Sequence, residues 1–162
     1  MARELITSWE GYQTAIDRLL FMACQKICIY DEDLGQLKLE SSLRLPQIKQ
    51  MLRAGHKESL QIIVRNAERL HNQSPLLIKL LTDFSHLATA QQSPPNMAHL
   101  RDSMLIIDDK HALIRFERDL PRSKLLVDEI DELKPYLNRF SDALFVLARV
   151  AAGEAEPISR TE

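Results

Sequence analysis

Residues 103–116, SMLIIDDKHALIRF, are the stretch that decides the fold. Two apolar runs flank the polar residues Asp108, Asp109 and Lys110. Two such runs around two or three polar residues predict antiparallel strands joined by a tight turn. The chain is therefore expected to contain a β-hairpin here, and the segments on either side of it set the rest of the fold.

Helix-like and strand-like patterns alternate before the hairpin. Start and stop signals predict three helices: about residues 8–24 begun by a Thr7–Glu10 capping box, a second from near Pro46 to Gly55, and a third that Ser74 caps ahead of Pro75. Short apolar runs predict strands at residues 26–31, 60–64 and 86–90. Each of the three predicted helices is therefore followed by a strand.

The segments around and after the hairpin are interpreted from their prolines and their apolar spacing. Consecutive prolines predict a loop over residues 91–98. Residues 118–131 are expected to be mostly loop. A last helix is predicted over about residues 132–151, with Pro135 in its first turn.

This order of elements predicts an α/β fold. Strands that alternate with helices and end in a hairpin and a packing helix imply a layered, mixed β-sheet flanked by helices. The expected layout is βαβαβ, followed by a β-hairpin and a C-terminal helix. Since 162 residues fit one core, residues 1–152 are expected to form a single domain, and residues 153–162 a polar tail.

Composition argues against several classes of function. Twenty-one Lys and Arg against 23 Asp and Glu leave a net charge of -2, so no global basic field is available to hold nucleic acid or an anionic membrane. The four glycines form neither a Walker loop nor a GxGxxG turn, and no cofactor is expected. No apolar run approaches 18 residues, so no membrane-spanning helix is expected.

The cysteines and histidines predict no metal site. Cys24 and Cys28 lie in apolar surroundings, at a spacing typical of neither a redox pair nor a zinc ribbon, and are expected to be buried free thiols. No HxH or HxxxH spacing occurs among His56, His71, His86 and His111. Free thiols and an N-terminus without an export pattern indicate a cytoplasmic location.

The hairpin carries a resemblance to a known family. Residues 101–108 read RDSMLIID, and together with the order of elements they resemble one half of the phospholipase D superfamily. In that superfamily the first hairpin strand carries HxK, then four residues, then an aspartate. Aligning Asp108 with that aspartate puts Arg101 at the nucleophilic histidine and Ser103 at the lysine, so the motif is degenerate.

The resemblance also has implications for partners. The chain looks like a group of uncharacterised bacterial domains of this type, some of which follow an acetyltransferase domain. In that group we expect an acidic turn after the first strand, like Asp31-Glu32-Asp33, and a polar end to the second, like Arg65-Asn66. Active members of the superfamily pair two halves, so the resemblance implies a homodimer formed through the hairpin-side surface.

His99 offers an alternative nucleophile. On an extended strand His99, Arg101 and Ser103 would face the same side, so the first two could be a displaced HxK. The other interpretation is an inert histidine at the junction between loop and strand. The second is favoured, because in-line attack on phosphorus tolerates little displacement.

Polar residues at the predicted strand ends form a second candidate site. Open α/β sheets place ligands at such ends, where Asp31, Asp33, Asn66, Ser103 and Asp108 are expected to accompany three arginines. Arg65, Arg101 and Arg115 could hold an anion such as a nucleotide phosphate. The favoured alternative pairs Arg65 and Arg115 with these carboxylates in a structural network.

The function predicted from the sequence is a non-catalytic, phospholipase D-like accessory or binding domain of unknown ligand. A guanidinium stays protonated at physiological pH and cannot attack phosphorus, and a serine lacks the charge of the superfamily's lysine. Two alternatives remain: a diverged phosphodiesterase that uses His99, and an anion or nucleotide sensor that uses Arg65, Arg101 and Arg115.

Overall fold

The computed structural model of the protein describes residues 2–97 and 101–151. Its strands are β1 (Ala2–Ile6), β2 (Ile27–Asp31), β3 (Leu60–Val64), β4 (Ala88–Gln92), β5 (Ser103–Ile107), β6 (His111–Arg115) and β7 (Ser123–Val127). Its helices are α1 (Trp9–Met22), α2 (Arg44–Arg53), α3 (Glu68–Gln73), α4 (Pro75–Asp83) and α5 (Ile130–Ala151), with one turn of 3₁₀ helix, η1 (Pro95–Met97).

The seven strands form one mixed sheet in the order β1-β7-β6-β5-β2-β3-β4. Strands β2, β3 and β4 run parallel, and the other pairs are antiparallel. The predicted hairpin is β5–β6, joined by a turn in which Asp108 and Asp109 both have positive φ. The predicted α/β class, mixed sheet and C-terminal helix are therefore confirmed.

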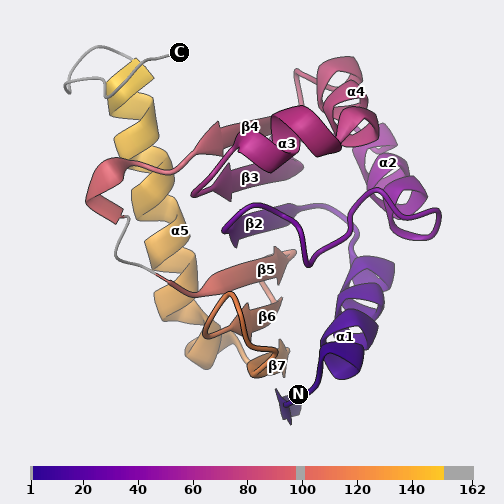
Figure 1. Ribbon diagram of the computed structural model, residues 1–162, viewed down its shortest axis with the longest axis vertical. Helices are drawn as coiled ribbons and strands as arrows, with labels where there is room; N and C mark the ends of the chain where they lie inside the picture. The colour runs from indigo at the N-terminus through magenta and orange to yellow at the C-terminus, as the bar shows by residue number, and fades with distance from the viewer. Residues whose placement is uncertain (1, 98–100, 152–162) are drawn as a thin grey trace.

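Each face of the sheet has its own core. Side chains alternate across a strand, so odd residues of β2 face one side and even residues face the other. Ile27 and Ile29 join the core under α1, α2, α3 and α4, whereas Cys28 and Tyr30 join the core under α5. Figure 1 shows α5 on one side of the sheet and α1 and α2 on the other.

Two strands lie where the sequence predicts none. Residues 118–131 are expected to be mostly loop, but β7 occupies Ser123–Val127 and pairs with both β6 and β1. Strand β1 is exposed at four of its five residues and so lacks an apolar face. Both are held by long-range pairing, which local pattern does not report. Helix α3 is also additional, and it contains the exposed His71.

Several predicted helix boundaries are wrong by a few residues. Ser8, not Thr7, caps α1, and its side chain accepts a hydrogen bond from the Gly11 N–H. Helix α5 begins at Ile130, which places Pro135 inside the helix beyond its first turn. Helix α2 begins two residues before Pro46.

Two further predictions need comment. Cys28 is buried as predicted, but Cys24 is exposed, because it lies in the loop after α1 has ended. His99 and the predicted tail 153–162 lie outside the described residues. Within the described ranges, no helix is both long and apolar enough to cross a membrane.

Candidate functional site

The carboxyl ends of β2, β3 and β4 meet at one edge of the sheet, here called the carboxyl edge (Figure 1). Strand β6 also ends there, and β5 and β7 begin there. Most residues that the sequence singles out lie at or beside this edge: Asp31, Asp33, Arg65, Asn66, Arg101, Ser103 and Arg115. Among the described candidate site residues, Asp108 alone lies elsewhere.

Asp31, Ser103 and Arg115 form a buried cluster, here called the Asp31–Arg115 cluster. Arg115 is 1% exposed, and its Nη2 lies 3.2 Å from both Asp31 Oδ1 and Ser103 Oγ. The second Asp31 oxygen accepts a hydrogen bond of 2.7 Å from the Leu34 N–H, which begins the turn after β2. The cluster is therefore an ion pair held between three adjacent strands and tied to a loop.

Aromatic side chains from α1 cover this ion pair. The Trp9 and Tyr12 ring centres lie 5.5 and 5.0 Å from the guanidinium carbon of Arg115. Burial raises the pKa of Tyr12 well above its ordinary value, although the Arg115 charge works in the opposite direction. The phenol therefore stays neutral over the physiological range, and both rings offer cation–π contact to a desolvated guanidinium.

Arg115 keeps hydrogen-bonding capacity that the described chain does not use. Its Nε and Nη1 are buried and have no hydrogen-bond partner among the described residues. Buried N–H groups without partners are rare in proteins. They are the strongest indication in the described residues that the cluster could receive another polar group.

Arg65 is held in a second set of contacts at the same edge. Its Nε donates to Glu32 Oε1 at 2.9 Å, and its Nη1 donates to the Asp102 carbonyl at 3.1 Å. Its Nη2 reaches the Arg101 carbonyl at 3.3 Å. The guanidinium also lies over the Tyr30 ring. Arg65 thus fixes the segment that precedes β5.

The remaining predicted residues at the edge shape the loops. Asp33 Oδ1 accepts from the Gly35 N–H at 2.9 Å and pairs with Arg69. Asn66 Oδ1 accepts from the Glu68 N–H at 2.9 Å, at the start of α3. Arg101 is exposed at the rim.

Asp108 lies at the opposite edge of the sheet. It follows β5, whereas Ser103 begins that strand, so the whole strand separates the two residues. Its carboxylate accepts backbone hydrogen bonds of 2.8–3.1 Å from Cys24, Gln25 and Lys26. The expectation that Asp108 joins the other site residues is therefore wrong, because β-strand geometry carries it to the far end.

The hydroxyl group of the Asp31–Arg115 cluster lies against the cation of the cluster. Ser103 Oγ contacts Arg115, a cation that accepts no proton, and a serine nucleophile requires an adjacent base. Throughout residues 2–97 and 101–151, no three His, Cys, Asp or Glu side chains come together as a metal site. What the described residues show at this place is a charge pair with a hydroxyl bonded to its cation.

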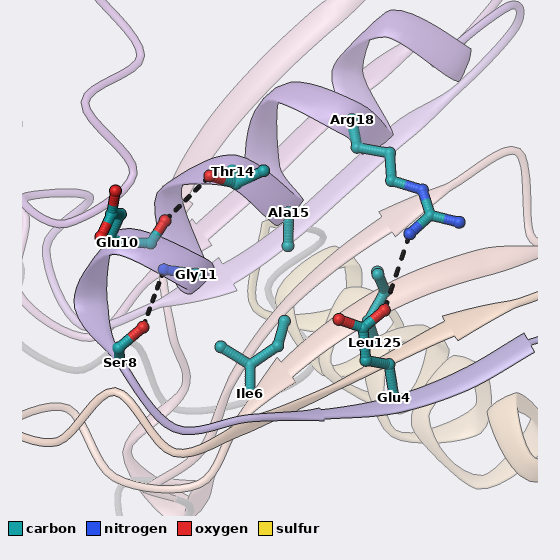
Figure 2. A pocket seen from close by; sticks show the side chains of 9 residues that line it. All are labelled: Glu4, Ile6, Ser8, Glu10, Gly11, Thr14, Ala15, Arg18 and Leu125. Carbon is teal, nitrogen blue, oxygen red and sulfur yellow. Dashed lines mark hydrogen bonds and ion pairs between the residues drawn. The ribbon is translucent and has the colours of Figure 1, made fainter.

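A pocket of about 350 Å³ is lined by none of the three residues of this cluster. Figure 2 shows it between β1 and α1, with Glu4 and Arg18 joined across it. None of the residues that the sequence singles out for function lines this pocket. Its volume is therefore not evidence for activity at the carboxyl edge.

Sequence reasoning missed several residues that complete the carboxyl edge. Trp9 and Tyr12 come from α1, and the Glu32 carboxylate forms ion pairs with both Arg65 and Arg118. Asp102 forms an ion pair with Arg139 of α5, with 2.6 Å between Asp102 Oδ2 and Arg139 Nη1. No spacing in the sequence links α1 or α5 to the edge. The available signal was the acidic Asp31-Glu32-Asp33 turn, of which the prediction used only the aspartates.

Comparison with solved structures identifies the fold. The chain superposes on TrmBL2, described as an archaeal chromatin protein with a novel mode of DNA binding, with a TM-score of 0.64 and 12% identity. Nuc from Salmonella typhimurium, a phospholipase D family member, gives 0.58 and 11%. NucT from Helicobacter pylori gives 0.56 and 13%. At these identities the likeness shows a shared phospholipase D-like fold.

The extent of these matches differs. Each covers 88% of this chain, but the chain spans about half of TrmBL2 (51%) and nearly all of Nuc (93%) and NucT (95%). No curated protein matches the chain in sequence. One family model, described as Domain of unknown function (DUF7931), matches residues 8–144. The chain therefore belongs to this family.

Proposed function

We propose that this chain is a non-catalytic, phospholipase D-like accessory or binding domain. The observation that carries the proposal is the Asp31–Arg115 cluster. Ser103, which aligns with the superfamily's lysine, is bonded to a buried arginine whose charge is already matched by Asp31. A structural ion pair occupies the place where the resemblance implies a free cation for phosphate.

The residue aligned with the nucleophile supports the same proposal. Arg101 is exposed at the rim and cannot act as a nucleophile, since a guanidinium remains protonated. Among the described residues at the cluster, none is a histidine that could act as general acid or base. Binding without turnover is the function that these groups support.

Hydrolysis of bis(p-nitrophenyl) phosphate by the purified chain tests the proposal. We expect the wild type and His99→Ala to release nitrophenol at the same rate as buffer. Turnover in the wild type that disappears in His99→Ala would instead establish the diverged phosphodiesterase. A second control, His86→Ala, changes an exposed histidine of the α4–β4 turn and identifies contaminating activity, which would survive both substitutions.

An anion or nucleotide sensor is the second candidate, favoured by the two unpartnered nitrogens of Arg115. In this second candidate Arg101 provides the accessible charge, and Arg65 and Arg115 are the largely buried charges at the same edge of the sheet. Inorganic phosphate and ATP should then raise the thermal unfolding temperature of the wild type but not of Arg101→Ala. Arg53→Ala, which removes an exposed arginine at the end of α2, should respond like the wild type. Equal protection of Arg101→Ala would reject the sensor.

Nucleic acid is not included among the proposed ligands. TrmBL2 is described as binding DNA, but the likeness to it shows only a shared fold. This chain has a net charge of -2, and Arg65, Arg118 and Arg139 are paired with carboxylates at the carboxyl edge. Affinity for a phosphate backbone depends on unpaired cations that release counterions. We expect no shift of a 30-base-pair duplex in gel electrophoresis.

The partners and location are part of the proposal. A second copy and an acetyltransferase-type domain are the expected partners, both implied by the resemblance alone. The unit is proposed to extend over residues 1–152. A cytoplasmic location is supported by Cys24 and Cys28, both free thiols.

A further inference from the structure

Strand β4 leaves one edge of the sheet open. The strand order places β1 at one end and β4 at the other, so each has a neighbour on only one side. Exposed edges are sites of unwanted pairing, which proteins commonly block with charged residues or proline. Strand β1 carries Arg3 and Glu4, whereas β4 reads ATAQQ and contains neither a charge nor a proline.

The direction of the main-chain groups in β4 follows from its pairing with β3. The Leu87 carbonyl accepts from Leu60, and the Ser93 N–H donates to Val64, so odd residues direct these groups toward β3. By the alternation of a strand, Ala88, Ala90 and Gln92 direct theirs away from it. No described neighbour is bonded to the main chain of Ala90 or Gln92 on that side, and the Ala88 N–H is used by Phe84.

We infer that β4 pairs with β4 of a second copy of this chain, antiparallel and centred on Ala90. In this register Ala90 faces its own equivalent, and Ala88 faces Gln92. The two Ala90 residues exchange a pair of hydrogen bonds, and each Ala88 carbonyl accepts from the partner's Gln92 N–H. The Ala88 N–H that is already used is not required.

The side chains of β4 suit this self-pairing. Thr89 and Gln91 are exposed on one face and lie opposite each other in the non-hydrogen-bonded positions. A hydroxyl then meets an amide, and no like charges are brought together. Self-pairing of β1 would instead have to place Arg3 and Glu4 within a short ladder, where Arg3 is already bonded to Glu132 of its own chain.

The structure also argues against dimerisation along the sides of the hairpin. Strands β5 and β6 lie inside the sheet between β2 and β7, and all ten of their residues are buried. The edge of β4 is the alternative that leaves these strands untouched. This inference deepens the second copy named in the proposed function by assigning its interface, and it holds whether or not the chain hydrolyses a phosphodiester.

Sedimentation equilibrium across a concentration series tests the inference. The wild type should rise from 18.6 kDa toward twice that mass as the concentration increases. Thr89→Lys and Ala90→Pro should remain monomeric, the first by charge repulsion and the second by removing an outward N–H that the fold does not use. Leu5→Lys, at an exposed position of β1, should dimerise like the wild type. Unchanged circular dichroism would show that the variants fold.

Each contrary result is decisive. A wild type that is monomeric at every concentration overturns the inference, and so does a dimer that survives Thr89→Lys. Loss of the dimer in Leu5→Lys alone would assign the interface to β1.

Cross-linking tests the register itself. In a Cys24→Ser background, we mix Thr89→Cys protein with Gln91→Cys protein and oxidise them. Non-hydrogen-bonded antiparallel pairs place Cα atoms about 4.5 Å apart, which permits a disulfide. The mixture should form a cross-linked dimer, and each variant alone should form little. Equal cross-linking of either variant with itself would contradict the register.

Discussion

At the scale of single residues, Asp108 shows how one carboxylate can hold a loop. It has a φ of 54°, and its oxygens accept from three consecutive backbone N–H groups at residues 24–26. Removing an acceptor leaves such donors unsatisfied. We expect Asp108→Ala to lower the free energy of unfolding by about 2 kcal/mol in urea denaturation.

Two variants separate the causes of that loss. Asp108→Asn tolerates the left-handed backbone and keeps one carbonyl oxygen, so it should cost less than alanine. Asp109→Ala removes a neighbouring carboxylate whose contact with Lys26 is exposed and 3.5 Å long, so its loss measures mainly the cost of alanine at positive φ and should be clearly smaller than that of Asp108→Ala. Equal losses at Asp108 and Asp109 would show that turn conformation, not the three hydrogen bonds, sets the stability.

Cys28 should behave as a buried, neutral thiol. Burial raises its pKa from 9.0 to about 12, whereas Cys24 is exposed. The stability that the neutral thiol contributes is complete below about pH 9, where the unfolded thiol is also protonated, and is lost as the pH rises toward 12. In native protein at pH 8, a chromogenic disulfide reagent should modify Cys24 alone. Rapid modification of the Cys24→Ser variant without unfolding would contradict this burial.

At the scale of elements, the start of α4 depends on a residue far from it in sequence. Ser74 occupies the cap position but makes no side-chain hydrogen bond, and Glu40 Oε2 instead accepts from the Leu77 N–H at 2.7 Å. We therefore expect Glu40→Ala to destabilise the protein by about 1 kcal/mol and Ser74→Ala by much less. Thermal unfolding of both variants measures the contrast. A larger loss of stability in Ser74→Ala than in Glu40→Ala would show instead that Ser74 caps α4, as the sequence predicts.

The same contrast explains which elements were predictable from the sequence. Strands β2, β3, β5 and β6 are buried on both faces, so each contains a run of apolar residues that predicts a strand. Strand β7 is only partly buried, and β1 exposes four of its five residues and pairs with β7 alone. Local sequence does not encode that pairing. For the same reason it could not show that Glu40 reaches α4.

At the scale of the whole molecule, the sheet decides which predicted site residues meet. Asp31 and Arg115 are far apart in sequence, yet adjacent strands bring them together at one edge, as strand-end reasoning predicts. Asp108 is only five residues from Ser103, but a strand rises about 3.3 Å per residue, which carries it to the opposite edge. The covering rings of Trp9 and Tyr12 depend on how α1 packs on the sheet, which spacing does not reveal.

The central claim concerns what the Asp31–Arg115 cluster contributes to the whole fold. A buried ion pair that serves structure is costly to break from one side, because the remaining charge is left without a partner. A group kept for a ligand commonly reduces stability, so its removal leaves the fold unchanged or more stable. The free energy of unfolding therefore distinguishes the two roles.

The most direct measurement is a double-mutant cycle on Asp31 and Arg115 by urea denaturation without added anions. We predict that Asp31→Leu and Arg115→Met each lower the free energy of unfolding by about 3–5 kcal/mol, and that the double variant loses much less than their sum. An Arg115→Met variant as stable as the wild type would contradict the account, because that arginine would then be retained for a ligand rather than for the fold.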